Sequence, residues 1–208
     1  MIEIFPGVFH WSVFHDPIRA RVSSYYAEPA GIVIDPKLPE GGLEELPGKP
    51  EQVVLTTGLH HRDAQQFADA FEIPIRASEE AVERLGGALE VQPFADREEI
   101  APGVTALRVG KLCPDEGALH LAVDSGALAF ADGVHHYGGA LGFFSDELLG
   151  DEPDEVKRGL KDAYRGLLTR DFEHLLFAHG DPLVGGGRAA LTDFVNSPVG
   201  QEDFGQAV

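Results

Sequence analysis

The sequence has little cysteine, few basic residues and no long apolar run, and each shortage excludes a class of protein. Its 208 residues contain one cysteine, Cys113, so no intrachain disulfide framework can form. Lys and Arg number 16 against 35 Asp and Glu, which gives a net charge of −19. Nucleic-acid binding needs a basic face that releases counterions, and the same charge repels anionic lipid. We therefore expect neither nucleic acid nor a membrane surface as a partner.

No stretch of the chain approaches membrane-spanning length, and the first residues lack the basic and apolar regions of a signal peptide. A soluble cytoplasmic protein is the expectation. The apolar fraction of 43% suffices for a sizeable core, and the length fits one domain spanning residues 1–208. These features do not indicate an oligomeric state.

Short apolar runs separated by turns predict many strands and few helices. In the N-terminal half, strands are predicted in residues 2–13, 21–27, 31–34, 53–55 and 73–76, with helices at 64–71 and 79–85. A succession of strands is predicted in the next segment, at 89–91, 98–100, 104–109, 118–123 and 128–131. The C-terminal part predicts a loop at 133–150, an amphipathic helix at 154–168, a strand at 175–177 and a final helix after 185–187. This order predicts sheets faced by helices.

The stretch VVLTTGLHHRDAQQFADAF, residues 53–71, predicts a buried strand, a polar turn and a helix. The turn contains His60, His61, Arg62 and Asp63 in succession. A strand, polar turn and helix in this order is typical of a site at the carboxyl end of a strand. The ordinary alternative is that the two histidines are turn residues and that Asp63 is a first-turn acid facing the helix dipole.

Further candidates follow other predicted strands. Asp132 and His179 each come directly after a buried strand, and His135 and His136 lie in a Gly-rich loop that would line a pocket mouth. The structural alternatives are a strand-ending turn for Asp132, a capping imidazole for His179 and a surface loop for the histidine pair. Elsewhere, Asp115 and Glu116 are expected to be surface charges, and Cys113 a packing residue.

The order of these segments resembles the metallo-β-lactamase superfamily over nearly the whole chain. FPGVFHW and GIVIDP resemble its first strands, and VVLTTGLHHRDAQQF resembles its Thr-His-x-His-x-Asp-His motif with the following helix. KLCPDEGALHL resembles its His-Thr-Pro-Gly-Ser segment, ALAFADG its strand ending in Gly-Asp, and LLFAHGDP its late Gly-His-Gly turn. The resemblance implies an α/β (α+β) fold, a four-layer αββα sandwich with a metal site at one edge between two sheets.

The central motif departs from the family pattern. Aligned on the buried face of the helix, Gly58 falls at the first His, His60 at the second, Arg62 at the Asp and Asp63 at the last His. A shift by one residue would rotate the apolar face of the helix by ~100°. Further along, Leu112 replaces the third His, whereas the later Asp and His are matched.

The resemblance therefore implies a degenerate metal site with His60, Asp63, Asp132 and His179 as candidate ligands. Gly58 and Leu112 offer no ligand atom, so a dinuclear zinc site is not expected. One divalent ion, Zn²⁺, Mn²⁺ or Fe²⁺, is the expected cofactor, because carboxylate and imidazole donors suit these metals.

Three functions remain open, each with a small molecule as partner. The first is a mononuclear metal-dependent hydrolase of a small ester, thioester or phosphoester. In it Asp132 and His60 are catalytic, while Arg62 and the histidines at 61, 135 and 136 bind the ligand. The second is a non-catalytic, metal-free ligand-binding or regulatory protein, in which Arg62 replaces the metal by bridging Asp63 and Asp132. The third is a metal-free enzyme that uses the same His and Asp as acid and base.

Overall fold

The N-terminal apolar runs form a seven-stranded sheet in chain order. Its first half is antiparallel and its second half, from β4 to β7, is parallel. The strands are β1 (Ile2–Phe5), β2 (Val8–His15), β3 (Ala20–Ala27), β4 (Ile32–Ile34), β5 (Gln52–Val54), β6 (Ile75–Ser78) and β7 (Val91–Phe94). The parallel half places the ends of β4 and β5 side by side, with Ile34 opposite Val54.

A second sheet of five strands has the order β14-β11-β10-β9-β8. Its strands are β8 (Glu99–Ala101), β9 (Val104–Arg108), β10 (Gly117–Leu121), β11 (Ala127–Phe130) and β14 (His174–Phe177). All neighbours are antiparallel except β11 and β14, which are parallel and pair Phe130 with Phe177. A parallel pair requires a long crossover. Here the crossover contains the hairpin β12 (His135–Tyr137) and β13 (Ala140–Gly142) and the helix α3 (Pro153–Leu167).

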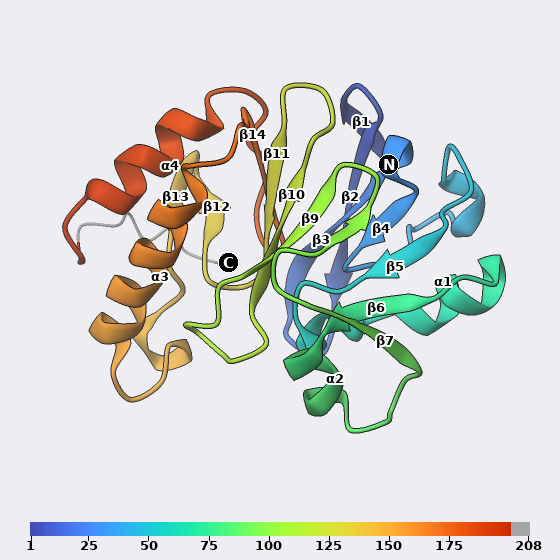
Figure 1. The fold of residues 1–208 in the computed structure, drawn as a ribbon, viewed down its shortest axis with the longest axis horizontal. Coiled ribbons are helices and arrows are strands. Elements are labelled where there is room, and N and C mark those ends of the chain that lie inside the picture. The colour runs from blue at the N-terminus through green and yellow to red at the C-terminus, as the bar shows by residue number, and fades with distance from the viewer. Residues whose placement is uncertain (201–208) are drawn as a thin grey trace.

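Helices cover the outer faces of both sheets in the computed structural model, which describes residues 1–200 (Figure 1). The helices α1 (Ala64–Phe71) and α2 (Glu79–Leu85) pack on the seven-stranded sheet, whereas α3 and α4 (Gly187–Asn196) pack on the other. Four short 3-10 helices complete the described chain: η1 (Glu28–Ala30), η2 (Leu43–Glu45), η3 (Gly58–His61) and η4 (Asp146–Leu148).

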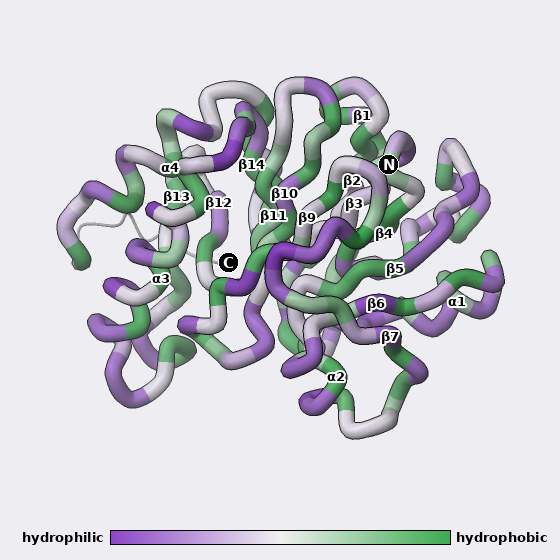
Figure 2. The backbone as a smooth tube through the Cα atoms, viewed as in Figure 1, coloured by the Kyte–Doolittle hydropathy of each residue, from purple (hydrophilic) through white to green (hydrophobic). Residues whose placement is uncertain are grey.

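Buried side chains form three clusters, one between the sheets and one under each helical layer. In Figure 2 the hydrophobic segments gather along the central strands, and the hydrophilic ones lie mostly on the outer helices and loops. The predicted four-layer αββα sandwich is therefore confirmed. None of the helices in residues 1–200 combines the length and the hydropathy needed to cross a bilayer.

Several boundaries differ from the sequence prediction by one or more residues. The predicted loop at 133–150 contains the β12–β13 hairpin, because His135 pairs with Gly142 across it. The strand predicted at 89–91 begins at Val91, where pairing with Ile75 begins. The long helix begins at Pro153, one residue before the predicted range of 154–168, because proline suits the first turn of a helix. The last eight residues of the expected 1–208 domain lie outside the described range.

Phe67 tests the packing of α1 on the seven-stranded sheet. Its side chain is fully buried, next to Trp11 and Phe71. We expect Phe67→Ala to lower the free energy of unfolding by about 3–5 kcal/mol, the usual loss for a buried aromatic side chain. Phe14→Ala is the matched control, because Phe14 is 48% exposed and its loss should cost less than ~1 kcal/mol. Urea denaturation of both variants checks this, and equal losses would contradict the packing described.

Candidate functional site

Strand ends from both sheets meet at one edge of the sandwich. On the five-stranded sheet, Asp132 and His179 each lie two residues beyond the paired Phe130 and Phe177, so the parallel register places them together. On the seven-stranded sheet, Asp35 directly follows β4, and η3 follows the neighbouring strand β5. The four segments converge because each follows the carboxyl end of a strand at the same edge.

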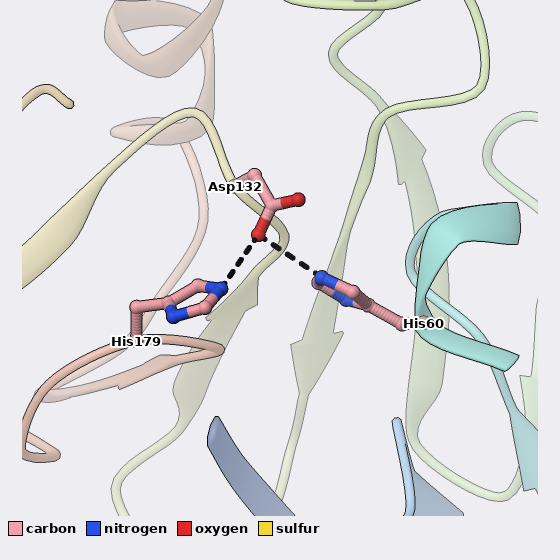
Figure 3. Close-up of side chains that lie close together, drawn as sticks. All are labelled: His60, Asp132 and His179. Carbon is pink, nitrogen blue, oxygen red and sulfur yellow. Dashed lines mark hydrogen bonds and ion pairs between the residues drawn. The ribbon is translucent and has the colours of Figure 1, made fainter. Parts of the chain in front are cut away.

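Three side chains from these segments point at one another (Figure 3). The Nε2 atom of His60 lies 3.0 Å from Oδ1 of Asp132, and Nε2 of His179 lies 3.2 Å from the same oxygen. The candidate ligand atoms of the three residues all lie within 4.8 Å of one another. Sequence reasoning selected these three residues, and the structure brings them together.

Asp35 holds His60 from the opposite side. Its Oδ2 lies 2.9 Å from Nδ1 of His60, and its carboxylate accepts hydrogen bonds from the backbone N–H and the hydroxyl of Thr56. The backbone of Asp35 has a φ of 47°, a region that side-chain-bearing residues rarely adopt. A carboxylate that accepts from Nδ1–H orients the ring, so Nε2 points toward Asp132.

The charges around His60 and Asp132 support each other. Burial by itself lowers the pKa of His60, but the carboxylates of Asp132 and Asp35 outweigh burial and the opposing charge of Arg62, raising it to about 9. Burial by itself would raise the pKa of Asp132, yet His60 and the hydrogen bond from His179 hold it well below its usual range. In the metal-free protein at neutral pH, His60 is therefore an imidazolium between two carboxylates.

The turn that carries His179 is fixed by the seven-stranded sheet and by the β12–β13 hairpin. Ser23 of β3 donates its N–H to the Ala178 carbonyl and its hydroxyl to the Gly180 carbonyl. On the other side, His136 donates its N–H to the His179 carbonyl. Gly180 has a φ of 89°, and a Cβ there would overlap the His136 carbonyl, so only glycine fits this position.

Asp115 and Glu116 are buried, which corrects the expectation that they are surface charges. Asp115 accepts hydrogen bonds from the Thr57 hydroxyl, the Gly58 N–H and the guanidinium of Arg84. It therefore ties the start of η3 to α2. Burial raises the pKa of Glu116 to about 7, against the hydrogen bond that its carboxyl accepts from the Leu112 N–H. A short sequence pattern cannot show such burial, because the partners are distant in the chain.

Asp63 does not join the three-residue cluster, in contrast to its assignment as a candidate ligand. Its carboxylate contacts Nζ of Lys37 at 2.9–3.1 Å and accepts the Leu38 N–H at 2.8 Å. These bonds direct the carboxylate toward the segment after β4. Asp63 is the N-cap residue of α1, one position before the first turn in which it was expected, and its side chain makes no capping hydrogen bond.

Arg62 is directed inward but does not bridge Asp63 and Asp132. Its Nη1 donates to the carbonyl oxygens of Ser23 and Asp35, each at 2.9 Å. Its Nη2 is buried and has no hydrogen-bond partner within residues 1–200. The guanidinium is therefore held beside the cluster by backbone carbonyls rather than by the carboxylates.

The other predicted binding histidines have structural partners. His61 is exposed, and its Nδ1 contacts the Gly58 carbonyl at 2.9 Å. His135 and His136 are buried, with ring nitrogens 3.0 and 2.8 Å from the carbonyls of Phe143 and Asp181. Burial lowers the pKa of His135, so it is neutral. The structure places these two imidazoles in the wall around His179 rather than on an open surface.

The donor set suits one transition-metal ion. Zn²⁺, Mn²⁺ and Fe²⁺ bind imidazole nitrogen and carboxylate oxygen. Bonds of about 2.1 Å in tetrahedral geometry separate two donors by about 3.4 Å. The two separations from the Asp132 oxygen, 3.0 and 3.2 Å, are close to this value, and all three donors lie within 4.8 Å of one another. Asp35 supplies the second carboxylate that a metal-binding imidazole usually contacts.

Sequence reasoning missed Asp35, although a signal for it was present. Asp35 follows a buried apolar strand, and the same reasoning selected Asp132 and His179 after their strands. The burial of Asp115 by Thr57 and Arg84 gave no comparable signal.

Known structures share this architecture at low sequence identity. TMB-1, a metallo-β-lactamase, has a TM-score of 0.69 and 13% identity over 93% of this chain and 94% of that one. DIM-1 metallo-β-lactamase has a TM-score of 0.69 and 11% identity over 93% of both chains. A flavo di-iron protein variant from Thermotoga maritima has a TM-score of 0.60 and 15% identity, over 90% and 57%. No protein-family model and no curated protein matches the sequence.

The raised pKa of His60 predicts a pH dependence of the metal-free protein. The ordinary pKa is 6.5 and the folded one is about 9, so this stabilisation is complete below pH 6.5 and is lost as pH rises through 9. In chelator, we expect the free energy of unfolding to fall between pH 7 and 10 more steeply in the parent than in His60→Gln. Urea denaturation across this range measures both slopes, and identical slopes would show that His60 is not an imidazolium.

Proposed function

We propose that this chain, which has the metallo-β-lactamase fold, is a hydrolase that acts with one divalent transition-metal ion held by His60, Asp132 and His179. The observation that carries the proposal is the convergence of the three ligand atoms within 4.8 Å at the edge between the sheets. The substrate class is a small ester, thioester or phosphoester, and the ion is Zn²⁺, Mn²⁺ or Fe²⁺. Such an ion supplies a Lewis acid that polarises a carbonyl or phosphoryl oxygen and activates water.

The chain's own residues have separate tasks in this proposal. Asp35 keeps the proton of His60 on Nδ1, which leaves Nε2 free to act as a ligand. Among the three ligands Asp132 is the most open, with 22% of its side chain exposed against 5% for His60 and 8% for His179. Substrate therefore approaches on the Asp132 side, where the carboxylate can orient an incoming water by accepting its hydrogen bond.

The surroundings favour one ion over two. A Cβ at Gly58 would lie 3.0 Å from Cδ of Arg84 and 3.1 Å from the Ala81 carbonyl, so a ligand side chain there would require α2 to move. Asp63, the other candidate carboxylate, is bound to Lys37. A second ion would therefore share Asp132 and find too few donors of its own to compete with water.

A second candidate is a metal-free ligand-binding protein, and the charge balance favours it. Two carboxylates, Asp35 and Asp132, face two cations, Arg62 and protonated His60. The cluster is thus neutral without any metal. This candidate differs from the hydrolase in one measurable respect, because the purified protein would hold no stoichiometric ion.

Metal content separates the two candidates. We expect the untagged protein, dialysed against Zn²⁺ or Mn²⁺, to retain one equivalent by elemental analysis, because three donors already converge. His60→Ala and His179→Ala should lose the ion. Asp63→Ala should retain it, as should the control His120→Ala, since His120 contacts the Asp171 carbonyl away from the cluster. An unloaded parent would favour the metal-free candidate, and two equivalents would contradict the single-ion site.

Asp35 provides a second test, because it touches the proposed ligand His60 but not the ion. We expect Asp35→Asn to weaken metal affinity by about 10–100-fold, the usual effect of losing such a supporting carboxylate. The affinity is measured by competition with a chromophoric chelator. The exposed carboxylate of Asp162 gives a control, Asp162→Asn, that should leave affinity unchanged. Unaltered affinity in Asp35→Asn would show that His60 needs no support.

A further inference from the structure

We infer that Arg62 is a built-in cation of this centre, so that the centre loaded with one divalent ion selects a ligand bearing an oxyanion, a carboxylate or a phosphate group. The inference rests on the proposed function, because it concerns the metal-loaded centre. It goes beyond that proposal by specifying that the ligand is negatively charged and that Arg62 determines this preference.

The backbone holds Arg62 in an unusual conformation that directs its side chain inward. Arg62 ends η3 with φ 29° and ψ −111°, a combination that residues other than glycine seldom adopt. Such strain persists only where surrounding contacts enforce it. Here the enforcing contacts are the two carbonyl oxygens, of Ser23 and Asp35, that accept from Nη1.

The guanidinium has hydrogen-bonding capacity left over. Two carbonyls satisfy Nη1, but Nη2 is buried without a partner in the part of the chain that the structure describes. No carboxylate lies within ion-pair distance of it there, although its charge acts on His60 and on Asp132. A guanidinium stays protonated at every physiological pH, so this positive charge is permanent.

Other charges near the centre are already paired. Asp63 is neutralised by Lys37 and Asp115 by Arg84. Asp35 and Asp132 then remain as anions, with Arg62 as the fixed cation. A divalent ion in place of the His60 proton leaves an excess of one positive charge. Glu116 removes only part of it, because burial raises its pKa to about 7 and it is partly protonated at neutral pH.

The local charge contrasts with that of the whole molecule. The net charge of −19 repels anions at long range, and salt screens this repulsion beyond about 8–10 Å. Close to the donors, the guanidinium of Arg62 and the divalent ion both attract a negatively charged oxygen of the ligand. The same cation opposes the binding of the metal itself, because two positive charges repel. Removing it should therefore affect the two ligands in opposite directions.

The predicted opposite effects on metal binding and anion binding are tested with Arg62→Gln, Arg62→Lys and the control Arg97→Gln. Arg97 is 80% exposed in its side chain, so its replacement makes the same change in net charge at the surface. Zn²⁺ affinity is measured by chelator competition, and acetate and inorganic phosphate are titrated calorimetrically into each Zn²⁺-loaded protein. We expect Arg62→Gln to bind Zn²⁺ about tenfold more tightly and both anions about tenfold more weakly, the order of magnitude of one partly screened charge. Arg62→Lys and Arg97→Gln should match the parent.

The alternatives give different patterns. Weakening of both metal and anion in Arg62→Gln would mean that Arg62 only supports packing, and unchanged affinities would mean that its charge does not reach the centre. Either result overturns the inference while leaving the proposed function intact. A parent that binds no Zn²⁺ overturns both. If Arg62→Gln does not fold, Arg62→Met, which keeps the length of the side chain without its charge, replaces it.

Discussion

The site depends on one imidazole shared between carboxylates of two different sheets. Asp35 follows a strand of the seven-stranded sheet, Asp132 follows one of the five-stranded sheet, and His60 contacts both at 2.9 and 3.0 Å. A buried carboxylate without a partner would be costly, and His60 stabilises both anions by lying between them. The ring thus joins the sheets at their open edge and sets the position at which Asp132 meets His179.

The surrounding contacts follow from that constraint. Gly117 donates its N–H to the Thr56 carbonyl, and Ser23 donates to the Ala178 carbonyl, so the sheets are hydrogen-bonded to each other on both sides of His60. Asp115 and Arg84 fix the start of η3, which carries the ring. Positioning therefore relies on backbone groups and buried ion pairs, which allow less movement than exposed side chains would.

The fold is shared with metallo-β-lactamases at 11–13% identity, so function has to be argued from the site. Three basic residues determine which carboxylates near this site are already paired with a cation. Lys37 pairs with Asp63 and Arg84 pairs with Asp115. Arg62 donates to the Asp35 carbonyl, and its charge acts on the carboxylates of Asp35 and Asp132. Together they leave a small donor set with a permanent positive charge, which is the basis of both the single-ion proposal and the anion preference.

The sequence by itself determined the layers and three of the site residues. The period of the apolar runs predicted which segments are strands and helices. That Asp132 and His179 meet at one edge was predicted by the resemblance of five ordered segments to the metallo-β-lactamase superfamily. His60 followed from its place between a buried strand and a helix. The strands and helices follow from local patterns, whereas the meeting of the three residues was an expectation from the resemblance.

Only the tertiary structure decided which acid meets which base. Asp63 pairs with Lys37, Asp35 with His60, and Asp115 with Thr57 and Arg84, across separations of 25 to 58 residues. These pairs depend on the direction of each side chain, which is set by strained or capped turns such as those at Asp35 and Arg62. A one-dimensional pattern shows that charges are present, whereas their partners follow from packing in three dimensions.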